Sequence, residues 1–94
     1  MVGHATVNGE TVVFSVVDVS EGGAGLVVPV QLVKGSNVEL EIETPQGIVR
    51  CNAEVRYSKP DSGGRGNFRT GVAFYPMHRL ERARWQRMLH RAAA

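Results

Sequence analysis

The chain has 94 residues, 43% of them hydrophobic, and a formal net charge of +2. A chain of this length and composition forms one domain with a small core, and its net charge indicates no particular class of partner. A lone cysteine excludes an internal disulfide and suits a reducing compartment, and no apolar run is long enough to cross a bilayer. Because Met1 leads almost directly into a predicted strand, we expect residues 1–94 to be a single domain cut from a longer protein.

The first part of the chain is typical of three short strands joined by tight turns. Residues 4–7 and 11–19 flank Asn8-Gly9, a dipeptide that favours a type I′ hairpin. Residues 24–28 form the third predicted strand, which Pro29 ends. Apolar side chains occupy both faces of residues 11–19, so we expect this strand to be buried on both sides, with the barrel interior on one and a packed segment on the other.

The next two strands alternate clearly between apolar and polar residues. In the first, the predicted inward side chains are Val38, Leu40 and Ile42, and the outward ones are Asn37, Glu39, Glu41 and Glu43. In the second, the predicted inward set is Val49, Cys51, Ala53, Val55 and Tyr57, opposite Arg50, Asn52, Glu54 and Arg56. Glutamates and arginines on hairpin partners predict cross-strand ion pairs. Cys51 lies in the inward set, which indicates a buried thiol of low reactivity.

A strand and a helix complete the chain. Residues 59–66 hold one proline and three glycines, a flexible loop, before a strand at residues 68–75 and a helix at residues 78–91. The predicted packing face of the helix comprises Met77, Leu80, Trp85, Met88 and Leu89. Five arginines in the last sixteen residues either face solvent or press on an anionic surface. The sequence therefore predicts a mainly β fold, a six-stranded antiparallel β-barrel over about 4–75 with a C-terminal α-helix over about 78–91.

The segment with the densest chemistry is Asp18-Val19-Ser20-Glu21-Gly22-Gly23, between the second and third strands. The two glycines permit a tight turn. A carboxylate can accept hydrogen bonds from the Watson–Crick edge of guanine, and free backbone N–H groups in a turn can hold an anionic oxygen. From the local chemistry alone, a side-chain cap of the turn is an equally good interpretation.

The pattern Asp-x-Ser-x-x-Gly over residues 18–23 resembles a signature of the PilZ family of bacterial cyclic-di-GMP receptors. Gly71-Val72-Ala73-Phe74 is similar to the late strand of that family, and the likeness extends over nearly the whole chain. The resemblance implies that Asp18, Ser20 and Gly23 bind cyclic-di-GMP. Residues 14–26 are also similar to the PilZ segment of bacterial cellulose synthase catalytic subunits. A regulatory domain is implied, cytoplasmic in location and controlling an attached or partner enzyme such as a cellulose synthase, whose own place could be the inner membrane.

The second family signature, Arg-x-x-x-Arg before the first strand, is missing, because the first arginine in the chain is Arg50. Two later matches, Arg65 to Arg69 and Arg87 to Arg91, lie in the wrong part of the chain and are interpreted as solvated positions. The basic residues nearest to Asp18 in the chain, Lys34 and Arg50, belong to other segments, so no local cation replaces the missing pair. The alternative hypothesis is a PilZ-like domain without nucleotide binding that acts as a protein-interaction module.

Other classes of function have little support in the sequence. His4, His78 and His90 are scattered, without metal-ligand spacing to Cys51, so we expect no catalytic residue, no metal and no cofactor apart from the ligand. A nucleic-acid-binding barrel is disfavoured because the predicted outer face carries Glu39, Glu41 and Glu43 and few aromatic rings on which bases could stack.

Overall fold

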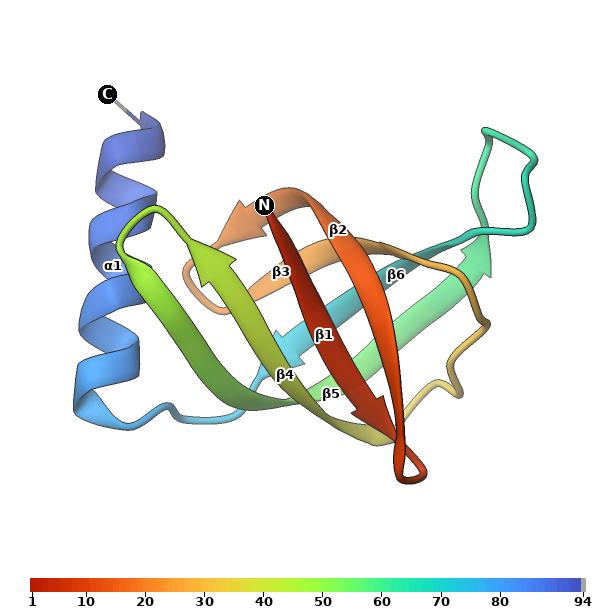
Figure 1. Cartoon of the computed structure of the whole chain (residues 1–94), viewed down its shortest axis with the longest axis horizontal. Helices are drawn as coiled ribbons and strands as arrows, with labels where there is room; N and C mark the ends of the chain where they lie inside the picture. Colours follow the sequence, from red (N-terminus) through yellow and green to blue (C-terminus); the bar gives the residue numbers. More distant parts are fainter. Residues whose placement is uncertain (94) are drawn as a thin grey trace.

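Six strands close into one antiparallel barrel in the computed structural model, which describes residues 1–93, and a helix lies across one end of it (Figure 1). The elements are β1 (Val2–Val7), β2 (Glu10–Ser20), β3 (Gly23–Val28), β4 (Asn37–Thr44), β5 (Gly47–Pro60), β6 (Phe68–Phe74) and α1 (Arg79–Ala93). Around the barrel the strands follow the order β1-β2-β3-β6-β5-β4. The predicted fold class is confirmed, and the predicted elements agree with the observed ones to within a few residues.

The β1–β2 hairpin has the turn that the sequence predicts. Asn8 and Gly9 have φ angles of 51° and 80°, and Val7 pairs with Glu10 across a two-residue loop. Two consecutive positive φ angles are the mark of a type I′ turn, which matches the twist of the flanking strands. The register of this hairpin is therefore fixed locally.

The β4–β5 hairpin also follows its alternating pattern. Val38, Leu40 and Ile42 are buried in the core, and their neighbours along β4 face outward. Glu41 pairs with Arg50 in register, and its carboxylate lies 3.5 Å from the Arg50 guanidinium. One of the predicted cross-strand ion pairs is thus confirmed on the outer face.

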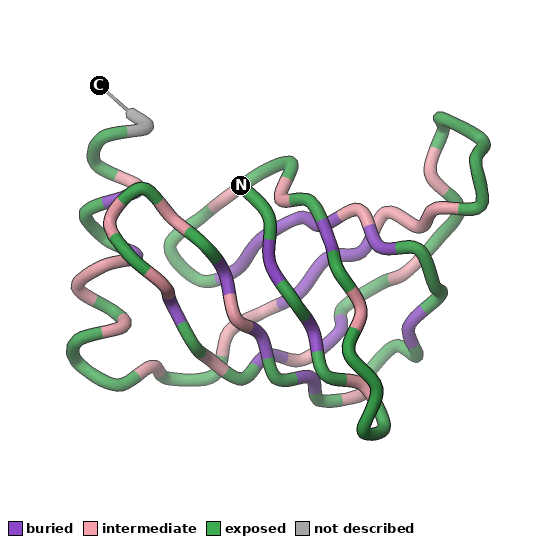
Figure 2. Tube along the Cα trace, in the orientation of Figure 1, coloured by how far each residue is buried: buried purple, intermediate pink, exposed green. Residues whose placement is uncertain are grey.

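The prediction for β2 is wrong on its outer side. Val13 and Val17 are 58% and 47% exposed, and none of the segments between residues 1 and 93 covers them. The inner set behaves as expected, with Phe14 buried in the core and Val12 and Val16 packed against it. Figure 2 shows the consequence, a strand on which intermediate or buried positions alternate with exposed ones instead of a strand buried throughout.

Helix α1 closes the end of the barrel beside the β4–β5 turn (Figure 1). Its buried residues are Trp85 and Met88, and the Trp85 ring meets Phe74 edge to face at 5.0 Å. Leu80, predicted on this face, is 60% exposed, so that prediction is wrong. At 100° per residue, Leu80 lies roughly 140° around the helix axis from Trp85, which turns it away from the barrel.

Side chains of the same helix form hydrogen bonds with backbone groups on an unpaired edge of β5. Strand β6 pairs with β5 only from Ala53 onward, so the preceding residues have no strand on that side. There the Arg50 N–H donates to the Glu81 carboxylate at 3.0 Å, and the Arg84 guanidinium donates to the Ile48 carbonyl at 2.8 Å. Side chains of α1 therefore take the place of a missing strand, which protects an otherwise open edge.

Cys51 lies on the inner side of β5 as predicted, opposite Leu40, but it is half-buried and not fully enclosed. Burial, together with the nearby Glu81 carboxylate, raises the pKa of the Cys51 thiol to about 12. Both effects disfavour the thiolate, which is the reactive form.

We therefore expect Cys51 to react slowly with a thiol reagent at pH 8. The thiolate fraction should be lower than in the unfolded chain, and labelling slower by about a hundredfold or more. Absorbance-monitored labelling of the native chain, with the chain in denaturant as the control, measures this ratio. Equal rates in the two states would contradict the inward register of β5.

Within residues 1–93, α1 is neither long enough nor apolar enough to span a bilayer.

Candidate functional site

The Asp18 segment owes its orientation to a bulge in β2. Val16 pairs with Leu26 and Asp18 pairs with Gly25, so Val17 is one residue more than β3 can match. The extra residue reverses the alternation of the strand. Asp18 and Ser20 consequently both face outward, whereas Val19 turns toward the core.

A second bulge, in β5, lies at the same height of the barrel. Val55 pairs with Val72 and Tyr57 with Gly71, which leaves Arg56 as the extra residue. Tyr57, predicted to point inward, is instead on the outer face and 40% exposed. The prediction failed because a bulge inserts one extra residue, which shifts the alternation of inward and outward side chains along the strand.

Between the two bulges, the outer face of the sheet carries two glycines. In register across four strands lie Asp18, Gly25, Gly71 and Tyr57. A Cβ on Gly25 would stand 2.8 Å from Asp18 Oδ2, and a Cβ on Gly71 would run into the Tyr57 ring. The facing glycines therefore let a carboxylate and an aromatic ring fold down over the sheet from opposite sides.

We call the depression above Gly25 and Gly71 the glycine hollow. It has a volume of about 340 Å³. Its lining includes all three predicted site residues, Asp18, Ser20 and Gly23, together with Tyr57 and Arg56 from β5. The structure thus brings the sequence-predicted residues together at one place.

Gly23 is required for space and not for an unusual backbone angle. Neither Gly22 nor Gly23 has a positive φ, but a Cβ on Gly23 would overlap the Val72 carbonyl oxygen. The Phe74 N–H donates to the Gly22 carbonyl at 2.8 Å, which holds the β2–β3 turn against β6. Gly23 therefore allows the backbone of the β2–β3 turn to lie in close contact with the backbone of β6.

Ser20 connects this turn to the helix. Its hydroxyl donates to the Gly23 carbonyl at 3.3 Å, the turn-capping bond that the sequence allowed as an alternative. Its own carbonyl accepts from the Trp85 indole N–H at 2.8 Å. The hydroxyl retains acceptor capacity toward a ligand in the glycine hollow.

Arg69 is the residue that the sequence interpretation missed. Arg65 and Arg69 were both predicted to be solvated. Arg65 is exposed, but the Arg69 guanidinium pairs with the Asp18 carboxylate. The Arg69 side chain is 34% exposed, and its Nη2 lies 3.2 Å from the Cβ position of Gly25. The expectation that no cation lies beside Asp18 is therefore wrong. Nearby, the Lys59 ammonium lies 5.1 Å from the centre of the Tyr57 ring.

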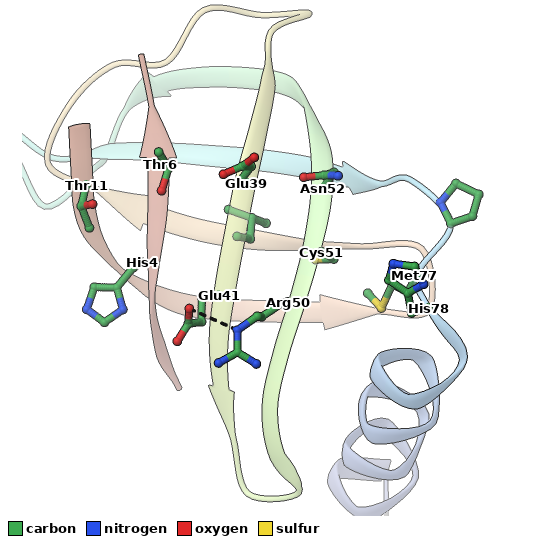
Figure 3. A pocket seen from close by; sticks show the side chains of 12 residues that line it. His4, Thr6, Thr11, Glu39, Glu41, Arg50, Cys51, Asn52, Met77 and His78 are labelled. Carbon is green, nitrogen blue, oxygen red and sulfur yellow. Dashed lines mark ion pairs between the residues drawn. The ribbon is translucent and has the colours of Figure 1, made fainter. Parts of the chain in front are cut away.

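A larger hollow of about 520 Å³ lies on the outer face of β1, β4 and β5 (Figure 3). Its lining includes the carboxylates of Glu39 and Glu41 and the guanidinium of Arg50, which is already paired with Glu41. Two carboxylates against one committed arginine give this surface little attraction for an anion. None of the predicted site residues reaches it.

The glycine hollow offers a distinct set of groups to a ligand. Asp18 supplies acceptor oxygens, Ser20 a hydroxyl and Tyr57 an aromatic ring. Arg56 lines the hollow, and Arg69 brings a second positive charge to its edge by pairing with Asp18. Gly25 and Gly71 lie beneath these groups, and their missing side chains leave the space that the Asp18 carboxylate and the Tyr57 ring occupy. Such a site suits a planar ring system with N–H donors on its edge and an anionic group close by.

Comparisons with known proteins agree with this architecture. The family model described as PilZ domain matches residues 3–91. Among solved structures, the fold is similar to one described as "PilZ domain with c-di-GMP of YcgR from Escherichia coli", with a TM-score of 0.72 and 18% sequence identity over 98% of this chain and 82% of that chain. No curated protein matches the sequence. At 18% identity, the likeness to the solved structure describes the fold alone.

Proposed function

Since the chain belongs to the PilZ domain family, we propose that it is a regulatory domain that binds cyclic-di-GMP in the glycine hollow. Asp18 and Ser20 recognise the edge of a guanine, and the Gly23 backbone completes the contact. The domain then controls an attached or partner bacterial enzyme instead of catalysing a reaction itself. The similarity of residues 14–26 to the PilZ segment of cellulose synthases supports an enzyme of that kind.

The observation that carries the proposal is the convergence of Asp18, Ser20 and Gly23 on one hollow. Two bulges and two facing glycines shape this part of the sheet and turn Asp18 and Tyr57 toward the same hollow. A guanine stacked on the exposed face of the Tyr57 ring would present its N–H edge to Asp18. Stacking on an aromatic ring and a charge-assisted bond to a carboxylate act together on such a base.

The hollow is near the lower end of the size range of ligand sites. A dinucleotide with two guanines and two phosphodiesters would therefore extend beyond it, over the outer face of β2. The Val16 N–H donates to the Met1 carbonyl at 2.8 Å, so chain placed before Met1 would continue along β2 toward Asp18. We accordingly propose that residues 1–94 are a PilZ domain of a longer, cytoplasmically exposed protein whose preceding residues complete the site.

A second candidate function is a protein-interaction module without nucleotide binding. It is favoured by the exposed valines Val2, Val13 and Val17 on the outer face of β1 and β2, and by the absence of an arginine before Arg50. An apolar strand face of this kind is typical of a contact surface.

The proposal predicts that Asp18→Ala and Gly25→Ala each weaken cyclic-di-GMP binding by roughly tenfold or more. Removing a charge-assisted hydrogen bond costs about 1.5–3 kcal/mol, and a Cβ on Gly25 displaces the same carboxylate. Nuclear magnetic resonance titration of the ¹⁵N-labelled chain measures weak affinities and locates the contact. We expect the largest shifts at the amides of Ser20, Gly23 and Gly71.

Val33→Ala is the control, since Val33 is 74% exposed and does not line the glycine hollow. It should leave the affinity unchanged. Shifts confined to the larger hollow, around His4, Glu41 and Arg50, would contradict the proposed site. No shifts at any ligand concentration would favour the interaction module.

A further inference from the structure

Arg69 lies beside the glycine hollow and pairs with Asp18, which lines it. It lies on β6 two residues before Gly71, and its side chain crosses β3 to reach Asp18 on β2. The lack of a side chain at Gly25 makes this path possible, because a Cβ there would press on both members of the ion pair. The arginine is therefore held at the edge of the site through its contact with Asp18.

The guanidinium has donors to spare. Among residues 1–93 its hydrogen-bond partner is Asp18, reached through Nη2, and its Nε is buried without an acceptor. An arginine carries five N–H donors in a planar fork that fits a phosphate. A buried charged donor without a partner is costly. The Nε atom is too buried to meet a ligand where it stands, so the remaining Nη donors are the ones that an anionic oxygen of a ligand can use.

The charges of Asp18 and Arg69 also favour an anionic group of the ligand beside Arg69. Asp18 Oδ2 is held by Arg69, and a guanine edge that binds Asp18 through two N–H groups competes with Arg69 for the lone pairs of that oxygen. As the base takes up Oδ2, the bond to Arg69 weakens and the guanidinium keeps its positive charge. An anion that arrives with the base compensates that charge at short range.

On the basis of the proposed function, we propose that Arg69 is a further ligand-binding residue, which turns from Asp18 to a phosphate of the bound guanine nucleotide. The chain thus supplies one of its own arginines to the site, from β6 and not from before β1. The exchange of partners makes recognition of the base and of the phosphate interdependent.

The test compares two ligands that differ in charge. The ¹⁵N-labelled chain and its Arg69→Gln variant are titrated with cyclic-di-GMP and with guanosine, which has the base but no phosphate. We expect Arg69→Gln to weaken cyclic-di-GMP binding by about tenfold and to leave guanosine binding unchanged or stronger. Arg69→Lys, which keeps the charge without the planar fork, should give an intermediate loss. Arg65→Gln, an exposed arginine of the same sequence match, should change neither affinity.

Three results would overturn the inference, and each can be told apart. An equal loss for both ligands would mean that Arg69 only positions Asp18. An unchanged affinity for cyclic-di-GMP in both Arg69 variants would mean that the arginine does not contact the ligand. Binding of neither ligand by the wild-type chain or by a version that carries the upstream arginines would refute the proposed function itself. The amide spectra of the variants show in each case whether the barrel is folded.

Discussion

Replacing Trp85 with alanine should lower the free energy of unfolding by about 3–5 kcal/mol, the usual cost of removing a large buried aromatic ring. Trp85 is 1% exposed, packs edge to face on Phe74, and donates its indole N–H to the Ser20 carbonyl. It is the residue that fastens the helix both to the core and to the β2–β3 turn. Its removal would leave a cavity and an unsatisfied carbonyl in the same place.

Leu80→Ala is the matched control on the same helix. Because Leu80 is 60% exposed and alanine is a good helix former, this substitution should change stability by less than about 0.5 kcal/mol. Urea unfolding followed by far-ultraviolet circular dichroism gives both values. Equal midpoints for the two variants would show that α1 does not pack on the barrel through Trp85.

Trp85→Phe separates the two contributions of the side chain. It keeps a ring against Phe74 but loses the indole N–H, so the Ser20 carbonyl loses its partner. We expect a smaller destabilisation than for Trp85→Ala, accompanied by amide shifts at Ser20 and Gly23.

Much of the fold could be predicted from the sequence because its signals are local. The Asn8-Gly9 turn and the alternation along β4 each depend on a few consecutive residues. The helix could be located by its composition, but Leu80 could not be placed, since an apolar residue near a helix end need not face the core. The candidate site residues Asp18, Ser20 and Gly23 were predicted from a motif, and in the structure they line one hollow.

What could not be predicted depends on pairing between distant strands. A bulge is a mismatch between two strands, and neither Val16-Val17-Asp18 nor Val55-Arg56-Tyr57 shows alone which residue is extra. Tyr57 was therefore placed on the wrong side. Arg69 is 51 residues from Asp18 in the chain, and its contact depends on the order β2-β3-β6, which the sequence did not reveal. The one available signal was the pair of glycines at positions 25 and 71, each in a strand interior.

Adding the upstream arginines of the family should have the largest effect on ligand binding. A longer version with an Arg-x-x-x-Arg segment before Met1 should bind cyclic-di-GMP more tightly by about 30-fold to beyond ten-thousand-fold. Each bidentate arginine contact contributes about 1–3 kcal/mol, and two would add roughly 2–6 kcal/mol. The geometry supports this, because the Met1 carbonyl already bonds to Val16 on β2, and preceding residues would pass beside Asp18.

The control for this extension replaces both added arginines with glutamine. It keeps the extra length and any new backbone pairing along β2 but removes the charge. If the glutamine version gains as much affinity as the arginine version, the gain comes from the backbone and not from contacts with phosphate or guanine.

The measurement that tests the account most directly is a calorimetric titration of cyclic-di-GMP into the 94-residue chain and into the arginine-bearing version, each with and without Asp18→Ala. We predict weak binding to the first, far tighter binding to the second, and a loss of at least about tenfold in the second when Asp18 is removed. Equally tight binding to both lengths would contradict the role given to the arginines. No binding to the arginine-bearing version, or an affinity indifferent to Asp18, would contradict the glycine hollow as a receptor site.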